Sequence, residues 1–113
     1  MVVRGPLALH RAGQIAEAER HYRAILQKTP DDVDASYLLG AARMQGGDAR
    51  EAAALFERAA TLRPDAAQFH IDHGKALVAI NQLHAAIASL RRALELAPGL
   101  ADTEFTQIGR AHV

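Results

Sequence analysis

The chain has 113 residues, 50% of them hydrophobic, and its 13 basic residues balance its 13 acidic residues. No helix face gathers lysine and arginine without acidic neighbours, so no nucleic-acid-binding surface is expected. The sequence has no cysteine, which excludes disulfides and thiolate metal sites, and no stretch long and apolar enough to span a membrane. These properties predict one small domain that buries its apolar residues internally.

Prolines recur every 34 residues, at Pro30, Pro64 and Pro98, and the residue types between them repeat in step. Alanine recurs in two registers, and glycine or asparagine, which tolerate left-handed backbone, recurs in a third. These registers are Ala8, Ala42 and Ala76; Ala18, Ala52 and Ala86; and Gly13, Gly47 and Asn81. Because proline cannot continue a helix, each period is predicted as helix, stop, helix, stop.

Three pairs of helices are therefore predicted. The expected bounds are 6–13 and 15–29, then 33–46 and 49–63, then 67–80 and 83–97, with a seventh helix beginning near 101. Gly5 and Pro6 replace the Leu-Gly pair that the middle unit has at Leu39-Gly40, so the first helix is expected to be short. Asp48 is expected to cap helix 49–63, and Asp31 or Asp32 the helix after Pro30.

Small residues at fixed positions are predicted to let the helices of one pair approach closely, with one large side chain filling the space between units. In the middle unit the pattern is Leu39-Gly40, Ala52, Phe56, Ala59 and Pro64, and the next unit repeats it as Gly74, Ala86, Leu90, Ala93 and Pro98. The first unit matches at Ala8, Gly13, Ala18, Tyr22 and Pro30. This pattern resembles the tetratricopeptide repeat family.

The resemblance implies an all-α fold, a right-handed α-solenoid of stacked antiparallel helix pairs. It predicts a single domain over 1–113, with units at about 1–32, 33–66 and 67–100 and a partial fourth unit at 101–106. It also implies that the first helices of the units line a concave groove that binds extended or helical peptides.

The residues expected to line this groove share one side of each first helix, by their i, i+4, i+7 and i+8 spacing. They are Tyr37, Ala41, Met44 and Gln45, then Ile71, Lys75, Val78 and Ala79, with His10 and Arg11 upstream and Phe105 downstream. Tyr37, Met44 and Ile71 are the expected apolar anchors, and Arg11, Gln45 and Lys75 the polar contacts. The alternative is that some of these residues, above all Ala41, Ala79 and Tyr37, only contact neighbouring helices.

Two branches of the family are disfavoured by the residues at these positions. Members that grip acidic C-terminal tails carry lysine and asparagine there, and Tyr37, Ala41 and Ile71 depart from that pattern. The repeats of O-linked N-acetylglucosamine transferases carry an asparagine at one fixed position, which Leu38 and Asp72 occupy here.

The last residues depart from the repeat. Phe105 keeps the phase of Tyr37 and Ile71, but the Leu-Gly pair due at 107 and 108 is displaced by one residue. The closing Ile108–Val113 also matches the translation, in one frame, of a short-read sequencing adapter. We therefore expect a natural chain cut near 106 or 107, with 107–113 a non-native tail; the alternative is an irregular capping helix. Genomic sequence across codon 108 distinguishes the two.

Truncation at this point would remove part of the cover from the last complete unit. The apolar face concerned contains Leu90, Ala93, Leu94 and Leu96. Self-association through this face is therefore expected.

Catalytic and metal-binding motifs find little support. His70 and His73 lie three residues apart, a spacing that can bind a metal, but only the distant His84 could add a third ligand, so no metal site and no cofactor is expected. No nucleophile motif, phosphate-binding glycine loop or carboxylate pair is present. The chain is thus predicted to be non-catalytic.

Two functions remain open. The first is a protein-protein interaction module that binds a peptide or protein of unknown identity. The second is the N-terminal targeting module of a larger bacterial glycosyltransferase or sulfotransferase. The opening residues, 1–6, lack the apolar run of a secretory signal, so a cytoplasmic location is expected.

Overall fold

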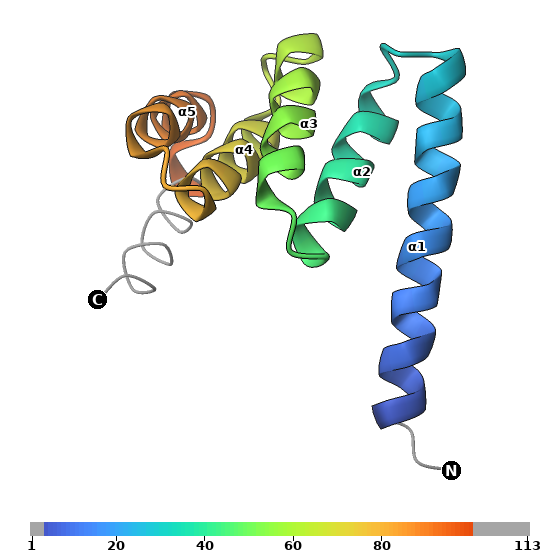
Figure 1. Cartoon of the computed structure of the whole chain (residues 1–113). Coiled ribbons are helices and arrows are strands. Elements are labelled where there is room, and N and C mark those ends of the chain that lie inside the picture. The colour runs from blue at the N-terminus through green and yellow to red at the C-terminus, as the bar shows by residue number, and fades with distance from the viewer. Residues whose placement is uncertain (1–3, 101–113) are drawn as a thin grey trace.

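The computed structural model describes the backbone of residues 4–100 and the side chains of residues 13–100. Within these residues the chain forms only helices: α1 (Arg4–Lys28), α2 (Val33–Gln45), α3 (Ala49–Leu62), α4 (Ala67–Ala79) and α5 (Leu83–Leu96) (Figure 1). The predicted all-α class is confirmed. No helix in the described part of the chain is both long and apolar enough to cross a membrane.

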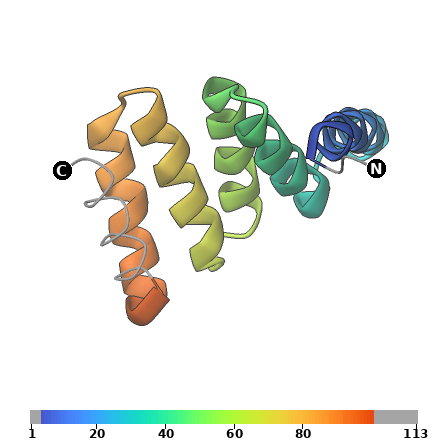
Figure 2. The ribbon, with the colours of Figure 1, turned by 90° about the horizontal axis from the view of Figure 1, so that it is seen from below.

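The helices stack in chain order. The most extensive contacts join α2 to α3 and α4 to α5, and α3 packs against α4 to connect the two pairs. Helix α1 lies mainly against α2 and contacts it less extensively. Viewed along a perpendicular direction, the helices again follow one another in chain order from α1, which is seen end-on, to α5 (Figure 2). The stack of helix pairs predicted for 33–97 is therefore present.

The turns inside the two pairs have the backbone that the sequence predicted. Gly47 has φ +89° and Asn81 has φ +62°, so both residues adopt the left-handed conformation that ends a helix and reverses the chain. The Asp48 carboxylate accepts a hydrogen bond from the backbone N–H of Glu51 at 3.0 Å and so caps α3. Asp32 caps α2 by accepting from the N–H of Ala35 at 2.9 Å, which decides between the two candidate aspartates.

Glycine lets the helices of each pair approach closely. A Cβ atom built at Gly40 would lie 2.8 Å from the Phe56 ring, and one built at Gly74 would lie 2.7 Å from Leu90 Cγ. Both large side chains are consequently buried, Phe56 to 3% exposure and Leu90 to 4%. The predicted arrangement of one large side chain against small residues is confirmed in both pairs.

The first pair is different, because α1 runs unbroken from Arg4 to Lys28. The expected stop at Gly13, and with it the separate helices 6–13 and 15–29, is wrong. A turn at Gly13 would break helical hydrogen bonds of α1, and the segment before it has Pro6 where the complete pairs have the close-contact glycines Gly40 and Gly74.

The predicted seventh helix, the partial unit at 101–106 and the tail at 107–113 lie outside the described residues.

Candidate functional site

The α2 residues that were expected to contact a partner are partly exposed at the surface. Gln45 is exposed, while Tyr37, Ala41 and Met44 are half-buried against the core that α2, α3 and α4 share. These three side chains therefore support the helix stack and still present part of their surface. Tyr37 thus contacts neighbouring helices, as the alternative interpretation held, and keeps part of its surface accessible.

On α4 the expected stripe is less accessible. Val78 and Lys75 are half-buried and Ala79 is exposed, but Ile71 has 0% exposure. Ile71 lies in a core cluster with Ala93 of α5, beside the half-buried Leu94. The expectation that Ile71 is a surface anchor is corrected, because its side chain lies between α4 and α5 with no surface left for a partner. His10, Arg11 and Phe105 lie outside the residues whose side chains are described.

Tyr37 is held in place by polar and aromatic contacts across α2 and α4. Its hydroxyl donates a hydrogen bond to Asp72 Oδ2, and Gln68 Nε2 donates to Asp72 Oδ1 at 3.1 Å. The Tyr37 ring stacks on Phe69, with 4.5 Å between ring centroids and 26° between planes, and lies 5.6 Å from the centroid of Phe56. Burial, reinforced by the adjacent Asp72 carboxylate, raises the pKa of Tyr37 well above its usual value.

Three polar residues of this cluster were not predicted as site residues. Asp72 and Gln68 lie one turn apart on α4, and the Arg63 guanidinium carbon lies 5.8 Å from the Phe69 ring centroid. Tyr37 and Ile71 have the same position in the repeat, which suggested that both point the same way. The spacing of Gln68 and Asp72, four residues apart on one helix, was the only sequence signal for this pair. We call Tyr37, Gln45, Gln68, Asp72 and Lys75 the α2–α4 face.

The two histidines singled out by the sequence lie on the other side of α4. His70 Nε2 donates to the carbonyl oxygen of Pro64 at 2.8 Å, and His73 Nδ1 lies 3.2 Å from Ser89 Oγ. Burial is the main cause that lowers the pKa of His73, with His70 adding to it and Glu57 opposing it. Within residues 13–100 no three His, Asp or Glu side chains are arranged to hold a metal ion.

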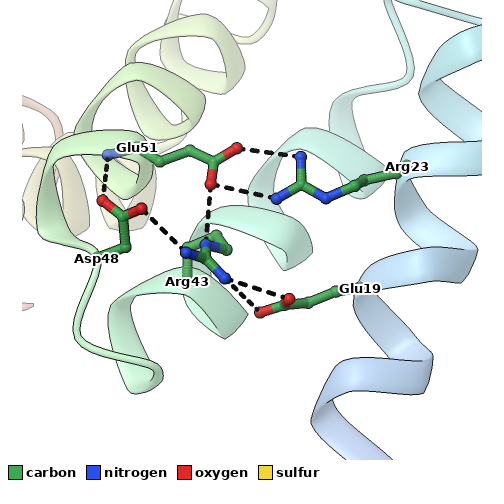
Figure 3. A network of polar contacts seen from close by, with 5 residues as sticks. All are labelled: Glu19, Arg23, Arg43, Asp48 and Glu51. Carbon is green, nitrogen blue, oxygen red and sulfur yellow. Dashed lines mark hydrogen bonds and ion pairs between the residues drawn. The ribbon is translucent and has the colours of Figure 1, made fainter.

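Ion pairs join α1 to the first complete pair. Arg43 lies 3.3 Å from a carboxylate oxygen of Glu19 on α1, 2.9 Å from Asp48 and 2.8 Å from Glu51 (Figure 3). Arg23 of α1 bonds the same Glu51 carboxylate at 3.0 Å. The backbone N–H of Glu51, followed by Arg43, lowers the pKa of Asp48. We call these five residues the α1 ion-pair network; it joins α1 to α2 and α3.

The apolar face expected near the end of the stack is largely covered. Leu90 has 4% and Ala93 0% exposure, because Leu90 fills the space at Gly74 and Ala93 packs with Ile71. The large apolar side chains that α5 does expose are Leu83 and Ile87, at 51% and 44%.

Comparison with known proteins agrees with the repeat and the helix stack. Two family models described as tetratricopeptide repeat match residues 7–67 and 67–100. A curated relative, the cellulose synthase 2 operon protein C of Komagataeibacter xylinus, is 43% identical over 54 residues, which are 48% of this chain and 4% of that protein.

Solved structures show the same architecture. A variant of the O-GlcNAc transferase of Thermobaculum terrenum matches with a TM-score of 0.69 and 39% identity, over 79% of this chain and 17% of the enzyme chain. The first tetratricopeptide domain of Spaghetti (RPAP3), bound to an HSP90 peptide, matches with a TM-score of 0.77 and 22% identity, over 90% of this chain and 82% of that domain. This chain thus spans a small fraction of its curated relative and of the transferase.

Proposed function

The chain belongs to the tetratricopeptide repeat family, and we propose that it is a non-catalytic interaction module that binds a peptide or protein segment on the α2–α4 face. The observation that carries this proposal is the fixed position of Tyr37. Its hydroxyl is bound by Asp72 and its ring by Phe69, so the side chain is ordered before any partner arrives. An anchor that is already ordered loses little conformational entropy on binding.

The chemistry of this face favours an uncharged or basic segment. Both carboxylate oxygens of Asp72 accept hydrogen bonds from within the domain, and each oxygen keeps a lone pair that can accept another. The Spaghetti domain is bound to an HSP90 peptide. The lysine and asparagine donors that grip acidic tails in the family are absent here, where Tyr37, Ala41 and Ile71 stand. A partner with an acidic tail is therefore not expected.

The test is selection of a displayed library of random peptides of varied charge against the chain, followed by calorimetric affinities of the selected peptides for variants. Gln45→Arg places bulk and positive charge at an exposed position of the face and is expected to weaken binding by about tenfold or more. Ala54→Arg makes the same change at an exposed position on α3 and is the matched control. Peptides that bind Gln45→Arg as tightly as the wild type, or lose equal affinity with Ala54→Arg, contradict the proposal.

A second candidate is a targeting module of a larger bacterial glycosyltransferase. The 39% identity to the Thermobaculum terrenum O-GlcNAc transferase over 79% of this chain favours it. In this role the repeats would bring a protein to a catalytic domain encoded downstream and would themselves only bind. A genomic sequence that continues into a long α/β region after the repeats would support this candidate, while further repeats and a stop codon would favour the separate module.

Self-association at the end of the stack is a further proposal for partner binding, and it would use Leu83 and Ile87, because Leu90 and Ala93 are buried. Substitution of Leu83 and Ile87 by glutamate is expected to abolish association through this surface. Sedimentation of the wild type and the double variant measures the oligomeric state of each.

A further inference from the structure

One face of α1 lacks the cover that the same face has in the other units. In α3 and α5 the register of Ala18 and Tyr22 is occupied by residues that are almost fully buried. Their exposed fractions are 0% for Ala52, 3% for Phe56, 1% for Ala86 and 4% for Leu90. Ala18 and Tyr22 are only half-buried, and they line an open surface hollow together with Gln14, Glu17 and His21.

The missing cover is a helix, and the complete pairs give its register. Gly40 contacts Phe56 and Gly74 contacts Leu90. Counted along the sequence, the midpoints of these two residue pairs are residues 48 and 82, which lie at the turns. The repeat places the corresponding centre in α1 at residue 14. A covering helix with this register would place its residue 6 at Tyr22 and its residue 10 at Ala18.

Residues 4–12, which have that register, cannot cover Ala18 and Tyr22 of their own α1. Residues 4–12 belong to the same continuous helix, and Gly13 is not among the residues with positive φ. In Figure 1 the N-terminal turns of α1 extend beyond the end of α2, away from the rest of the stack. The helix that covers and the face that is covered are thus both present in one chain but held apart.

We propose that two copies of this chain pair through antiparallel α1 helices that cross at Gly13 and Gln14. The N-terminal half of each α1 then covers Ala18 and Tyr22 of the other copy. The first repeat is completed in each copy by exchange of its first helix, with the turn replaced by continuous helix. Such exchange of an identical element is a low-cost route to a closed, symmetric dimer, because each copy supplies the helix that the other lacks.

Two features of the crossing support this pairing. A Cβ atom at Gly13 would meet no atom within 4 Å, so this position is open and lets a second helix backbone approach closely. One charge pair also matches: residue 11 is an arginine in a segment, 4–13, that has no carboxylate, whereas Glu17 is exposed beside the hollow. The register places position 11 of one copy opposite Glu17 of the other, twice by symmetry.

Disulfide trapping tests the crossing directly, since the chain has no cysteine of its own. Gln14→Cys places one thiol of each copy at the two-fold axis, so mild oxidation is expected to convert most of the protein into a covalent dimer. Ala54→Cys, at an exposed position of α3, is the matched control and is expected to remain uncoupled. Equal coupling of the two variants, or a wild-type chain that sediments as a monomer at all concentrations, overturns the proposal.

A second pair of variants separates exchange from a hairpin closed within one copy. Ala12→Gly with Gln14→Asp writes into α1 the Gly-Gly-Asp sequence with which the chain turns at Gly46, Gly47 and Asp48. This double variant is expected to close its own first repeat and to sediment as a monomer.

Ala16→Gly is the control, because it lowers helix propensity at a position that is helical both in the exchanged dimer and in the hairpin closed within one copy. It therefore leaves the ratio of these two forms unchanged. If the wild type already behaves as the Gly-Gly-Asp variant does, its own residues 4–12 cover the face and exchange is refuted. If the wild type is a dimer that the double variant leaves intact, the copies associate through another surface, which refutes exchange equally.

Discussion

The clearest quantitative prediction concerns Phe56 and Tyr22, two aromatic residues that occupy the same position of the repeat. Phe56 has 3% exposure and lies in the cluster that joins α2, α3 and α4, with the Gly40 backbone directly against its ring. Removing a buried phenylalanine side chain costs about 3–5 kcal/mol, since the lost transfer free energy is increased by the cavity that remains. Tyr22 is half-buried on α1, so Tyr22→Ala is expected to cost about 1 kcal/mol in the monomer.

This difference is large relative to the stability of a small domain, which is typically about 5–15 kcal/mol. Phe56→Ala is therefore expected to lower the melting temperature by at least about 12 °C and Tyr22→Ala by about 4–8 °C. Urea denaturation followed by far-ultraviolet circular dichroism measures the loss of unfolding free energy in each variant, and thermal denaturation measures the melting temperatures. Both use protein concentrations low enough for the chain to be monomeric. Equal losses for the two variants would refute the conclusion that the first repeat is open, and a loss below about 1 kcal/mol for Phe56→Ala would refute its place at the centre of the core.

Three further predictions follow from the polar contacts. Tyr37→Phe keeps the ring on Phe69 but removes the hydrogen bond to Asp72, so it is expected to cost about 1 kcal/mol at neutral pH. Because the folded state raises the pKa of Tyr37, the stability that Tyr37 contributes is present in full below pH 10.0 and is lost above it, so urea midpoints of Tyr37→Phe should fall less than those of the wild type at that pH. For His73 the sign is opposite: burial lowers its pKa, so the stability that neutral His73 contributes is present in full above pH 6.5 and is lost in acid. His73→Gln should therefore show a smaller fall between neutral and acidic urea midpoints. Arg43→Gln removes three ion pairs and is expected to speed hydrogen exchange of the α1 amides, an effect that added salt should diminish in the wild type by screening; unchanged exchange would mean that the network does not hold α1.

The periodic features of the chain were predictable because they depend on local chemistry. Gly47 and Asn81 adopt the left-handed backbone at the predicted turns, and Asp48 caps α3. The close approach at Gly40 and Gly74 followed from the size of the facing side chains, Phe56 and Leu90. Each of these predictions needs only the residue types within one unit.

The residues of the α2–α4 face were predicted less well, because position in the repeat does not determine which neighbours a side chain contacts. Tyr37 and Ile71 have equal positions in the repeat, yet Tyr37 turns to Asp72 of the following unit while Ile71 is buried beside Ala93. What surrounds each residue is set by its neighbours along the stack, and these neighbours differ from unit to unit. Position in the repeat therefore predicts the helix face but not the exposure of a side chain on it.

By itself the sequence determined the family, the 34-residue unit, the turns of the two complete pairs and the residues at which their helices touch, because these depend on backbone conformation and side-chain size within one unit. The tertiary structure alone decided the state of the first unit. Gly13 has the residue type and register of a turn, but a turn forms only when the helix before it buries enough apolar surface to offset the broken helical hydrogen bonds, and here α1 stays continuous. The same balance leaves Ala18 and Tyr22 half-buried on the face through which we propose that two copies pair.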